Sequence, residues 1–355
     1  MANVGQIFED ICKENDLKII RELGKGGFGL VKEVLYKKNS YAAKLIKKET
    51  NEKMNESNYI QEFRGPGIVK VQKIFTKKID KNTYNLILME KAPLKSLSQF
   101  NKYIFHKNYL RLIFKEPFET IGDNLIRFYV KQIVKGLELL DRGNFSHFDL
   151  KPENILTFVG MTLKLTDFGL LRNPENEKDS NNKVRIPGGT TGYISPECYH
   201  NNYVLDIKDV KKQDFFALGA TIFYLKYGEE MLEYNNYKDN SMTSDLIIDL
   251  LQKRIDEIKS GKLLDKDFID FLCSLINYDP KERPDFEAIY RNKWLNKNTE
   301  ELNDIIEINE IDEPKLILEL NKSDFLIPKK KYLQERRPKG NNERQLHKFI
   351  FKNED

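Results

Sequence analysis

Apolar residues in the first ninety positions change their spacing along the chain, and each change predicts a different element. Residues 4–12 carry Val4, Ile7, Phe8, Ile11 and Cys12 on one helical face, which predicts a short amphipathic helix that packs on the domain that follows. Beyond it the pattern becomes strand-like, with polar turns between the runs. The predicted strands begin at Leu17 and continue at 30–35, 40–46, 68–75 and 84–89, and the last two are joined by the polar turn 77–82.

After residue 90, the chain contains a segment with strong helical spacing. Leu125 to Leu140 show a strong helical pattern, and a further short helix is predicted around 286–290. Residues 97–123 are rich in aromatics, which predicts an extended helix and loop packed on the same domain, with a docking surface for a partner as the alternative.

The last sixty residues, 296–355, contain apolar patches and a basic cluster but no recognised motif. The apolar patches at 305–311 and 316–320 are expected to dock on the preceding domain, because disordered segments usually lack such residues. The basic cluster at 329–337 is interpreted as a solvated tail, and docking of a partner on residues 296–355 is the alternative.

Composition narrows the class of protein without naming a function. The 355 residues are 40% hydrophobic, enough for a packed core, and the formal charge of +4 argues for neither nucleic-acid nor membrane binding. The cysteines Cys12, Cys198 and Cys273 lie far apart, which fits neither a disulfide framework nor a zinc site. Early charges and the lack of a long apolar run predict a cytoplasmic protein, with the nucleus left open.

The central stretch His147–Asn154, His-Phe-Asp-Leu-Lys-Pro-Glu-Asn, contains residues suited to phosphoryl transfer. In a tight loop, Asp149 would accept the proton of a hydroxyl, Lys151 would neutralise the γ-phosphate, and Asn154 would hold a metal ion. Asp167, in Leu-Thr-Asp-Phe-Gly, follows a short apolar run thirteen residues later and is suited to a second metal contact.

Together these motifs resemble the signature of the eukaryotic protein kinase family. The resemblance implies an α+β, two-lobed fold with a small β-rich N-lobe at 17–90 and a larger, mainly helical C-lobe at 93–295. Residues 1–16 would form an N-terminal helical extension and 296–355 a C-terminal one. It also implies ATP and Mg²⁺ as cofactors and protein substrates as partners.

A glycine-rich segment stands where the family binds the nucleotide phosphates. Gly24, Gly26 and Gly29 form GxGxxG, which a dinucleotide-binding unit also uses. Here the chain continues as a strand rather than a helix, which favours a β-hairpin over the nucleotide, with Phe28 at its tip. The resemblance assigns Leu23 and Val31 to the nucleotide site, with Val31 against the adenine.

The next strand contains Lys44, which matches the lysine that pairs the α- and β-phosphates in the family. Ala42 would flank the adenine. Counting back from Gly-Pro-Gly-Ile-Val at 65–69 assigns the carboxylate partner of Lys44 to Glu56, with Glu52 and Glu62 as poorer candidates.

The apolar run that ends at Met89 leads into the predicted hinge. Met89 would stand behind the adenine as the gatekeeper, and Glu90 and Ala92 would bind its edge through the backbone, with Leu156 on the other side. Many relatives place an acid for the ribose where this chain has Ser96, so that contact is in doubt.

The activation segment, 167–197, departs from the pattern of regulated relatives. The Arg that usually precedes the catalytic Asp, and that binds a phosphorylated residue, is replaced by Phe148, and the middle of the segment offers only Ser180. We therefore predict a catalytic loop that no phosphate in this segment controls. Thr190 matches the threonine that bonds the catalytic Asp and Lys in serine/threonine kinases.

Three further residues have structural roles by the resemblance. Glu197 is expected to pair with Arg283, and Asp214 to bind the backbone of the catalytic loop. The resulting hypothesis is a serine/threonine protein kinase with Asp149, Lys151, Asn154, Lys44, Glu56 and Thr190 as its catalytic residues. A catalytically silent pseudokinase scaffold is the alternative, and a kinase of small molecules is disfavoured by the peptide-positioning segment 189–197.

Overall fold

The computed structural model describes residues 4–26, 29–48, 63, 65–102, 123–200, 202–232, 244–260 and 265–297. All of them belong to one compact unit of the chain, residues 1–325. The predictions for Phe28, Glu52, Glu56, Glu62, most of 97–123 and nearly all of 296–355 lie outside these residues.

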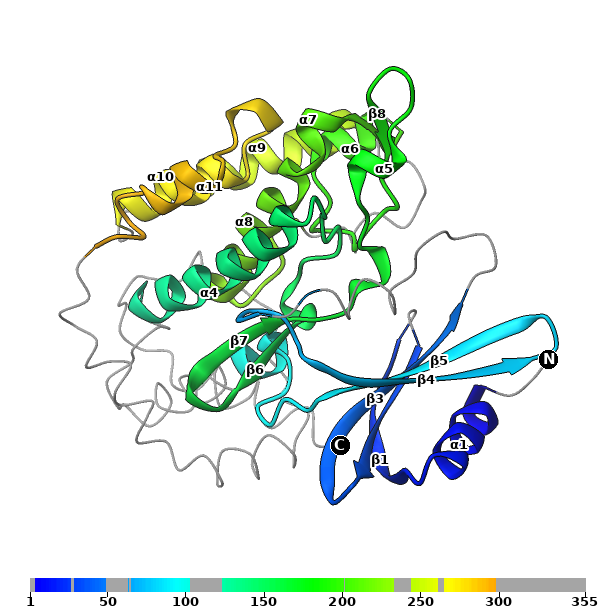
Figure 1. The fold of residues 1–355 in the computed structure, drawn as a ribbon. Coiled ribbons are helices and arrows are strands. Elements are labelled where there is room, and N and C mark those ends of the chain that lie inside the picture. Colours follow the sequence, from blue (N-terminus) through cyan, green and yellow to red (C-terminus); the bar gives the residue numbers. More distant parts are fainter. Residues whose placement is uncertain are drawn as a thin grey trace, which may run out of the picture. The chain divides into compact units, whose positions relative to one another are not determined.

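The small lobe contains an antiparallel sheet of five strands in the order β1-β2-β3-β5-β4 (Figure 1). The strands are β1 (Lys18–Gly26), β2 (Gly29–Tyr36), β3 (Asn39–Lys48), β4 (Val71–Ile79) and β5 (Asn82–Glu90). Successive side chains of β2, β3 and β5 point to opposite faces of the sheet, so each strand contributes residues to both faces. One face turns Leu30, Ala43, Leu45, Leu86 and Leu88 into a buried core.

The helix α1 (Val4–Glu14) packs on that apolar face of the sheet. Its buried residues are Ile7, Phe8, Ile11 and Cys12. Val4 differs from the sequence prediction, because its side chain is 50% exposed. A first-turn residue can follow helical spacing and still lie past the edge of the sheet.

Strand β4 also differs from its predicted bounds of 68–75. It begins later and ends at Ile79, so the turn consists of Asp80 and Lys81 rather than of residues 77–82. Lys77 and Lys78 remain in the strand because they pair with Tyr84 and Thr83 of β5. Lys77 also donates to Glu14 of α1 at 2.6 Å, which gives this polar residue a partner.

The large lobe is mainly helical (Figure 1). Its longer helices are α4 (Asp123–Arg142), α8 (Lys212–Tyr227), α9 (Ser244–Ser260) and α10 (Lys266–Leu275), and its short ones are α5 (Pro174–Glu177), α6 (Pro196–His200), α7 (Ile207–Val210) and α11 (Phe286–Tyr290). Helix α8 is buried almost throughout, so it forms the centre of this lobe. Within the described residues, no helix has the length and apolar character needed to span a membrane.

Two small antiparallel sheets complete the large lobe and carry the loops of interest. One pairs β6 (Ile155–Phe158) with β7 (Thr162–Leu165), and the other pairs β8 (Lys183–Arg185) with β9 (Val204–Asp206). The β6–β7 hairpin connects the loop that contains Asp149 to the residues around Asp167. This two-lobed α+β architecture confirms the fold class predicted from the sequence.

Candidate active site

Register in the small-lobe sheet gathers the predicted nucleotide residues on one face. Val31 pairs with Lys44, and Ala42 pairs with Met89. Directly paired residues point to the same side of a sheet, and residues two apart share a face. Val31, Ala42, Lys44 and Met89 therefore share the face opposite the apolar core under α1.

Lys44 reaches from this face to the large lobe. Its Nζ lies 2.8 Å from Oδ1 of Asp167, although the two residues are 123 positions apart in the chain. The lysine side chain is 6% exposed and that of Asp167 is 23% exposed. Asp167 adopts left-handed backbone angles, with φ of 61°. A buried cation and a partly open carboxylate thus meet between the lobes.

The Asp149 carboxylate is the centre of the catalytic loop. Its Oδ1 accepts bonds from the Thr190 amide at 3.1 Å and the Thr190 hydroxyl at 2.6 Å. Its Oδ2 accepts bonds from Lys151 Nζ at 2.9 Å and Asn154 Nδ2 at 2.8 Å. Lys151 also donates to the Thr190 hydroxyl. All four side chains are therefore held together at one point.

Asn154 and Asp167 carry the oxygen atoms that fit a divalent cation. The Asn154 amide donates to both the carbonyl oxygen and the carboxylate of Asp149, at 2.8 Å each, which directs its Oδ1 elsewhere. Mg²⁺ prefers oxygen ligands and often binds through one or two protein groups plus phosphate and water. Among the described residues, no group of three or more His, Cys, Asp or Glu side chains is placed to hold a metal ion.

A buried aspartate holds the backbone that precedes Asp149. The Asp214 carboxylate accepts the amides of His147 at 2.7 Å and Phe148 at 3.0 Å. Burial raises the pKa of Asp214, while His147 and the two amides act in the opposite direction. The contact expected from the sequence between Asp214 and the loop backbone is present.

The glycine-rich segment shows one position that requires glycine. Gly29 has a φ of 135°, and a Cβ there would lie 2.3 Å from the backbone oxygen of Leu45. At Gly24 a Cβ would meet nothing within 4 Å, so the space beside it is open. Leu23 is 40% exposed beside it. This arrangement leaves room for a phosphate to approach the backbone.

The predicted hinge, residues 90–92, connects β5 to the large lobe. Met89 is buried at its start, and Ser96 forms an isolated bridge with Leu156 of β6. Glu90 bonds to Lys164 of β7 at 2.7 and 2.8 Å. Met89 thus lies in the small lobe at the start of the hinge, and Leu156 lies in β6 of the large lobe, where it is bridged to the segment that follows the hinge.

The activation segment is held against the large lobe by polar bonds. Arg283 forms a bidentate ion pair with Glu197, as expected from the sequence. Its Nη1 donates to Oε1 at 2.6 Å and its Nη2 to Oε2 at 2.7 Å. Gln213 of α8 accepts the amide of Ser195 at 2.8 Å and donates to the carbonyl of Tyr193 at 3.0 Å. These bonds fix the end of the segment that contains Thr190.

Phe148 lies in a buried apolar cluster rather than at the surface. Its side chain is 1% exposed, and the cluster around it contains Val184, Ile186, Ile194, Cys198, Leu205 and Val210. Pairing of β8 with β9 brings Val184 opposite Leu205.

Cys198 is the one cysteine of this apolar cluster. Burial raises the pKa of its thiol to about 12, so this cysteine stays protonated at neutral pH.

The structure brings together most of the predicted catalytic residues. Lys44 meets Asp167, and Asp149 meets Lys151, Asn154 and Thr190. Sequence reasoning missed Glu33, Lys91 and Lys164, which form ion pairs around the hinge. Two of them could have been found from their positions. Glu33 lies two residues after Val31, so the two side chains share a sheet face, and Lys91 is itself a residue of the predicted hinge. No sequence pattern indicates Lys164.

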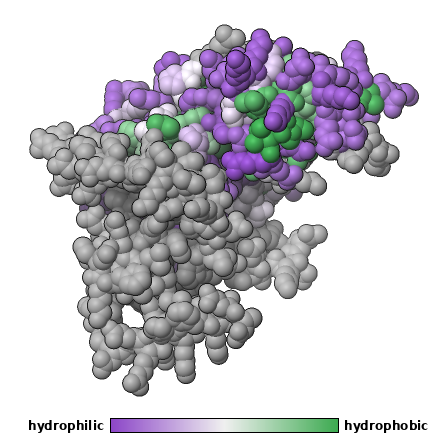
Figure 2. All heavy atoms as spheres, turned by 90° about the horizontal axis from the view of Figure 1, so that it is seen from below, coloured by the Kyte–Doolittle hydropathy of each residue, from purple (hydrophilic) through white to green (hydrophobic). Residues whose placement is uncertain are grey.

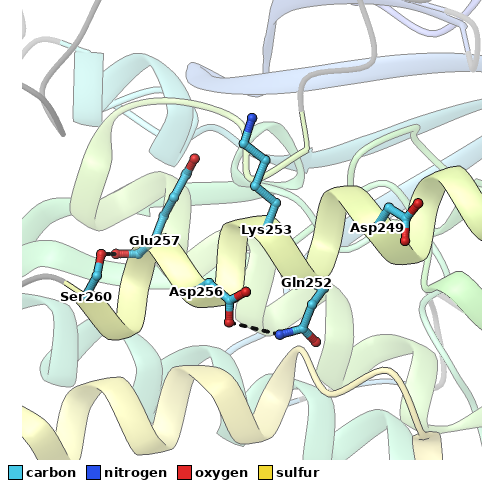
Figure 3. A pocket seen from close by; sticks show the side chains of 6 residues that line it. All are labelled: Asp249, Gln252, Lys253, Asp256, Glu257 and Ser260. Carbon is cyan, nitrogen blue, oxygen red and sulfur yellow. Dashed lines mark hydrogen bonds between the residues drawn. The ribbon is translucent and has the colours of Figure 1, made fainter.

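Two other surface features do not gather converging groups. A shallow hollow of about 550 Å³ lies along α9. Figure 3 shows that Lys253 and Glu257, which line it, point to one side of the helix, and Gln252 and Asp256 to the other. Gln252 donates to Asp256 at 3.0 Å. Figure 2 shows an apolar patch surrounded by hydrophilic residues on the face seen from below, which by itself identifies no ligand.

Comparison with known proteins adds independent information. A family model described as the protein kinase domain matches residues 17–295. The chain is 28% identical over 290 residues to an Aurora kinase of Saccharomyces cerevisiae, covering 80% of this chain and 70% of that protein. It is 27% identical over 298 residues to the serine/threonine-protein kinase AtPK1/AtPK6 of Arabidopsis thaliana, covering 79% and 56%.

A third relative is the calcium/calmodulin-dependent protein kinase cmkA of Emericella nidulans. It is 25% identical over 304 residues, which cover 81% of this chain and 64% of the relative. The matched region therefore covers between 56% and 70% of the length of these three relatives.

Proposed function

Because the chain belongs to the protein kinase family and its relatives include a serine/threonine-protein kinase, we propose that it transfers the γ-phosphate of Mg-ATP to serine and threonine hydroxyls of protein substrates. One observation supports this most directly. Lys44 of the small lobe and Asp167 of the large lobe are 2.8 Å apart, so one triphosphate can contact both.

Each residue of the site has a role that its contacts suit. Lys44 would pair with the α- and β-phosphates, with Glu56 as its predicted carboxylate partner. Asp167 and Asn154 would hold Mg²⁺, which neutralises charge on the phosphates when it is bound. Asp149 would accept the proton of the substrate hydroxyl, and Lys151 would stabilise charge on the transferring phosphoryl group.

The small-lobe face and the hinge would bind the nucleoside. Ala42, Val31 and Leu23 would cover the adenine from the small lobe, and Leu156 would support it from the large lobe. The backbone of Glu90 and Ala92 would bond to its edge, with Met89 behind the base. Gly24, Gly26 and Gly29 would let the backbone approach the phosphates.

A transfer assay tests this proposal. Purified protein with labelled ATP, Mg²⁺ and a generic protein substrate should label serine and threonine. Asp149→Asn should lower kcat by about 10²- to 10⁴-fold, since it removes the general base. A parent protein as inactive as Asp149→Asn would instead favour a silent scaffold, and preference for small alcohols over peptides would favour a small-molecule kinase.

We further propose that no phosphate in the activation segment is needed for activity. A phenyl ring cannot pair with phosphate, and the ring of Phe148 is buried among apolar residues of the segment, including Val184 and Ile194. Packing would thus hold the segment where other kinases use an Arg–phosphate pair. The activation segment also passes close to the backbone of Phe148 at Gly189. A Cβ on Gly189 would lie 2.8 Å from the Phe148 carbonyl oxygen, so a side chain there would disturb this contact.

Two variants separate packing from phosphorylation. Ser180→Ala, at an exposed position, should leave kcat unchanged, as should phosphatase treatment of the parent. Phe148→Ala should lower kcat, because it opens a cavity that releases the segment, and Phe148→Leu should restore part of the rate. Loss of activity after phosphatase treatment would contradict the proposal.

A further inference from the structure

Two consecutive hinge residues form ion pairs with different lobes. Glu90 pairs with Lys164 of β7 in the large lobe, and its Oε1 also accepts the amide of Lys70 at 2.7 Å. Lys91 pairs with Glu33 of β2 in the small lobe, at 2.5 Å. The hinge is therefore attached through side chains to both of the lobes that it connects.

Glu33 is an unusual residue for its position. It pairs with Ala42 across the β2–β3 ladder, which puts it on the sheet face that carries Lys44. Its side chain is 9% exposed. A carboxylate buried this far requires partners, because an uncompensated buried charge is strongly destabilising.

Three donors compensate the Glu33 carboxylate. Its Oε1 accepts bonds from Lys91 and from the Ser40 hydroxyl at 2.7 Å, and its Oε2 accepts Arg21 Nε at 2.8 Å. Burial alone would raise the pKa of Glu33, but the bonds from Lys91, Ser40 and Arg21 outweigh it and lower the pKa to about 2. The group is therefore charged at neutral pH, and Lys91 is its only partner from the hinge among these three.

We propose that the Glu33–Lys91 ion pair positions the hinge backbone for nucleotide binding. The inference rests on the proposed function, in which Glu90 and Ala92 bind adenine through their backbone. Lys91 lies between them, so its bond to β2 sets their distance from Val31 and Ala42. The apparent Kd of a ligand equals its intrinsic Kd divided by the fraction of molecules in the binding-competent geometry, so a hinge that often leaves this geometry binds more weakly. Glu33 and Lys91 are positioning residues, since neither needs to touch the nucleotide.

Nucleotide affinity and kinetics test this role separately from stability. Calorimetry with Mg-ATP gives Kd, and a peptide assay gives KM and kcat. Lys91→Met and Glu33→Gln should each raise Kd and KM for ATP about fivefold, the lower end of usual coupling between sites. The kcat should change less than twofold, and KM for the peptide should stay the same.

Controls on the same carboxylate sharpen the test. Arg21→Met removes a donor from Glu33 without touching the hinge and should leave Kd unchanged. Lys91→Arg keeps the charge and should restore parental affinity. Since each single variant breaks the same pair, Glu33→Gln combined with Lys91→Met should bind no worse than the weaker of the two.

The outcomes distinguish this inference from the proposed function. Folded Lys91→Met and Glu33→Gln proteins with parental Kd would overturn the inference, including when their melting temperature is lower. A parent that binds Mg-ATP but transfers no phosphate would contradict the proposed function, and the Kd comparison would still decide the role of the pair. A parent that binds no nucleotide would overturn both.

Discussion

Lys37 and Lys38 occupy a turn that usually selects other residues. They connect β2 to β3 between the paired Tyr36 and Asn39, with φ values of 48° and 68°. A two-residue hairpin with positive φ at both positions favours Asn-Gly, because side chains with a Cβ are strained there. The lysines therefore reduce the stability of this hairpin relative to the preferred pair.

Lys37→Asn combined with Lys38→Gly should stabilise the protein. The expected gain is about 1 kcal/mol in free energy of unfolding, from relief of left-handed strain. Thermal unfolding of both proteins measures it. As a control, Lys47→Asn changes a strand lysine and should give no such gain, and a lower melting temperature for the turn variant would contradict the prediction.

Glu33 makes stability depend on pH in a specific direction. Its folded pKa, about 2, lies below the ordinary value of 4.5, so its contribution is present above about pH 4.5. That contribution is lost as the pH falls from about 4.5 towards 2. Glu33→Gln lacks the ionisable group, so the difference in melting temperature between parent and variant should shrink from pH 6 to pH 3. A constant difference would show that Glu33 has no depressed pKa.

At the scale of elements, α1 is a cover for one side of the small-lobe sheet. Phe8 is fully buried, and Lys32 of β2 lies 5.1 Å from the centre of its ring. Val31 and Lys44 lie on the opposite face of the same strands. The stability of the sheet face proposed to bind the nucleotide thus depends on a segment that precedes the sheet in the chain.

Replacing Phe8 tests this dependence with a matched control in the same helix. Phe8→Ala should destabilise the protein by about 3–5 kcal/mol, through lost burial and a cavity. Val4→Ala, at a half-exposed position, should change stability by less than about 0.5 kcal/mol. Chemical denaturation measures both, and equal effects of the two substitutions would mean that α1 does not cover the core.

For the described part of the molecule as a whole, several polar bonds connect the two lobes. Lys44 bonds Asp167, and the amide of Val69 donates to the carbonyl of Leu165 at 3.0 Å. Glu90 accepts from Lys164 beside them. A ligand that contacts Lys44 and Asp167 together would add a further link between the lobes.

Mg-ATP should therefore raise the melting temperature. At 100 times its Kd, a ligand that binds only the folded state adds about 2.7 kcal/mol, which corresponds to a shift of several degrees. Asp167→Asn should reduce the shift with Mg-ATP, because a metal contact and the partner of Lys44 are changed. Differential scanning calorimetry with and without Mg²⁺ measures the effect, and an equal shift in parent and variant would argue against a role for Asp167 in binding.

Local patterns in the chain were sufficient for much of the fold. Alternation in β2 and β3 already separates Lys44 and Ala42 from the core residues Ala43 and Leu45, because side chains of a strand point to alternate faces. Helical spacing predicted α4 to within two residues at each end. The spacing of Asp149, Lys151 and Asn154 is a property of one loop, and they converge there as expected.

Contacts across long stretches of chain could not be read in the same way. Glu33 and Lys91 are 58 residues apart, and Glu90 and Lys164 are 74 apart, in a chain rich in both charges. Which lysine meets which carboxylate depends on strand register and on how the lobes pack. The burial of Phe148 among β8 and β9 residues has the same origin. Periodicity reports the face on which a side chain lies, whereas its partner is set by segments that folding brings together.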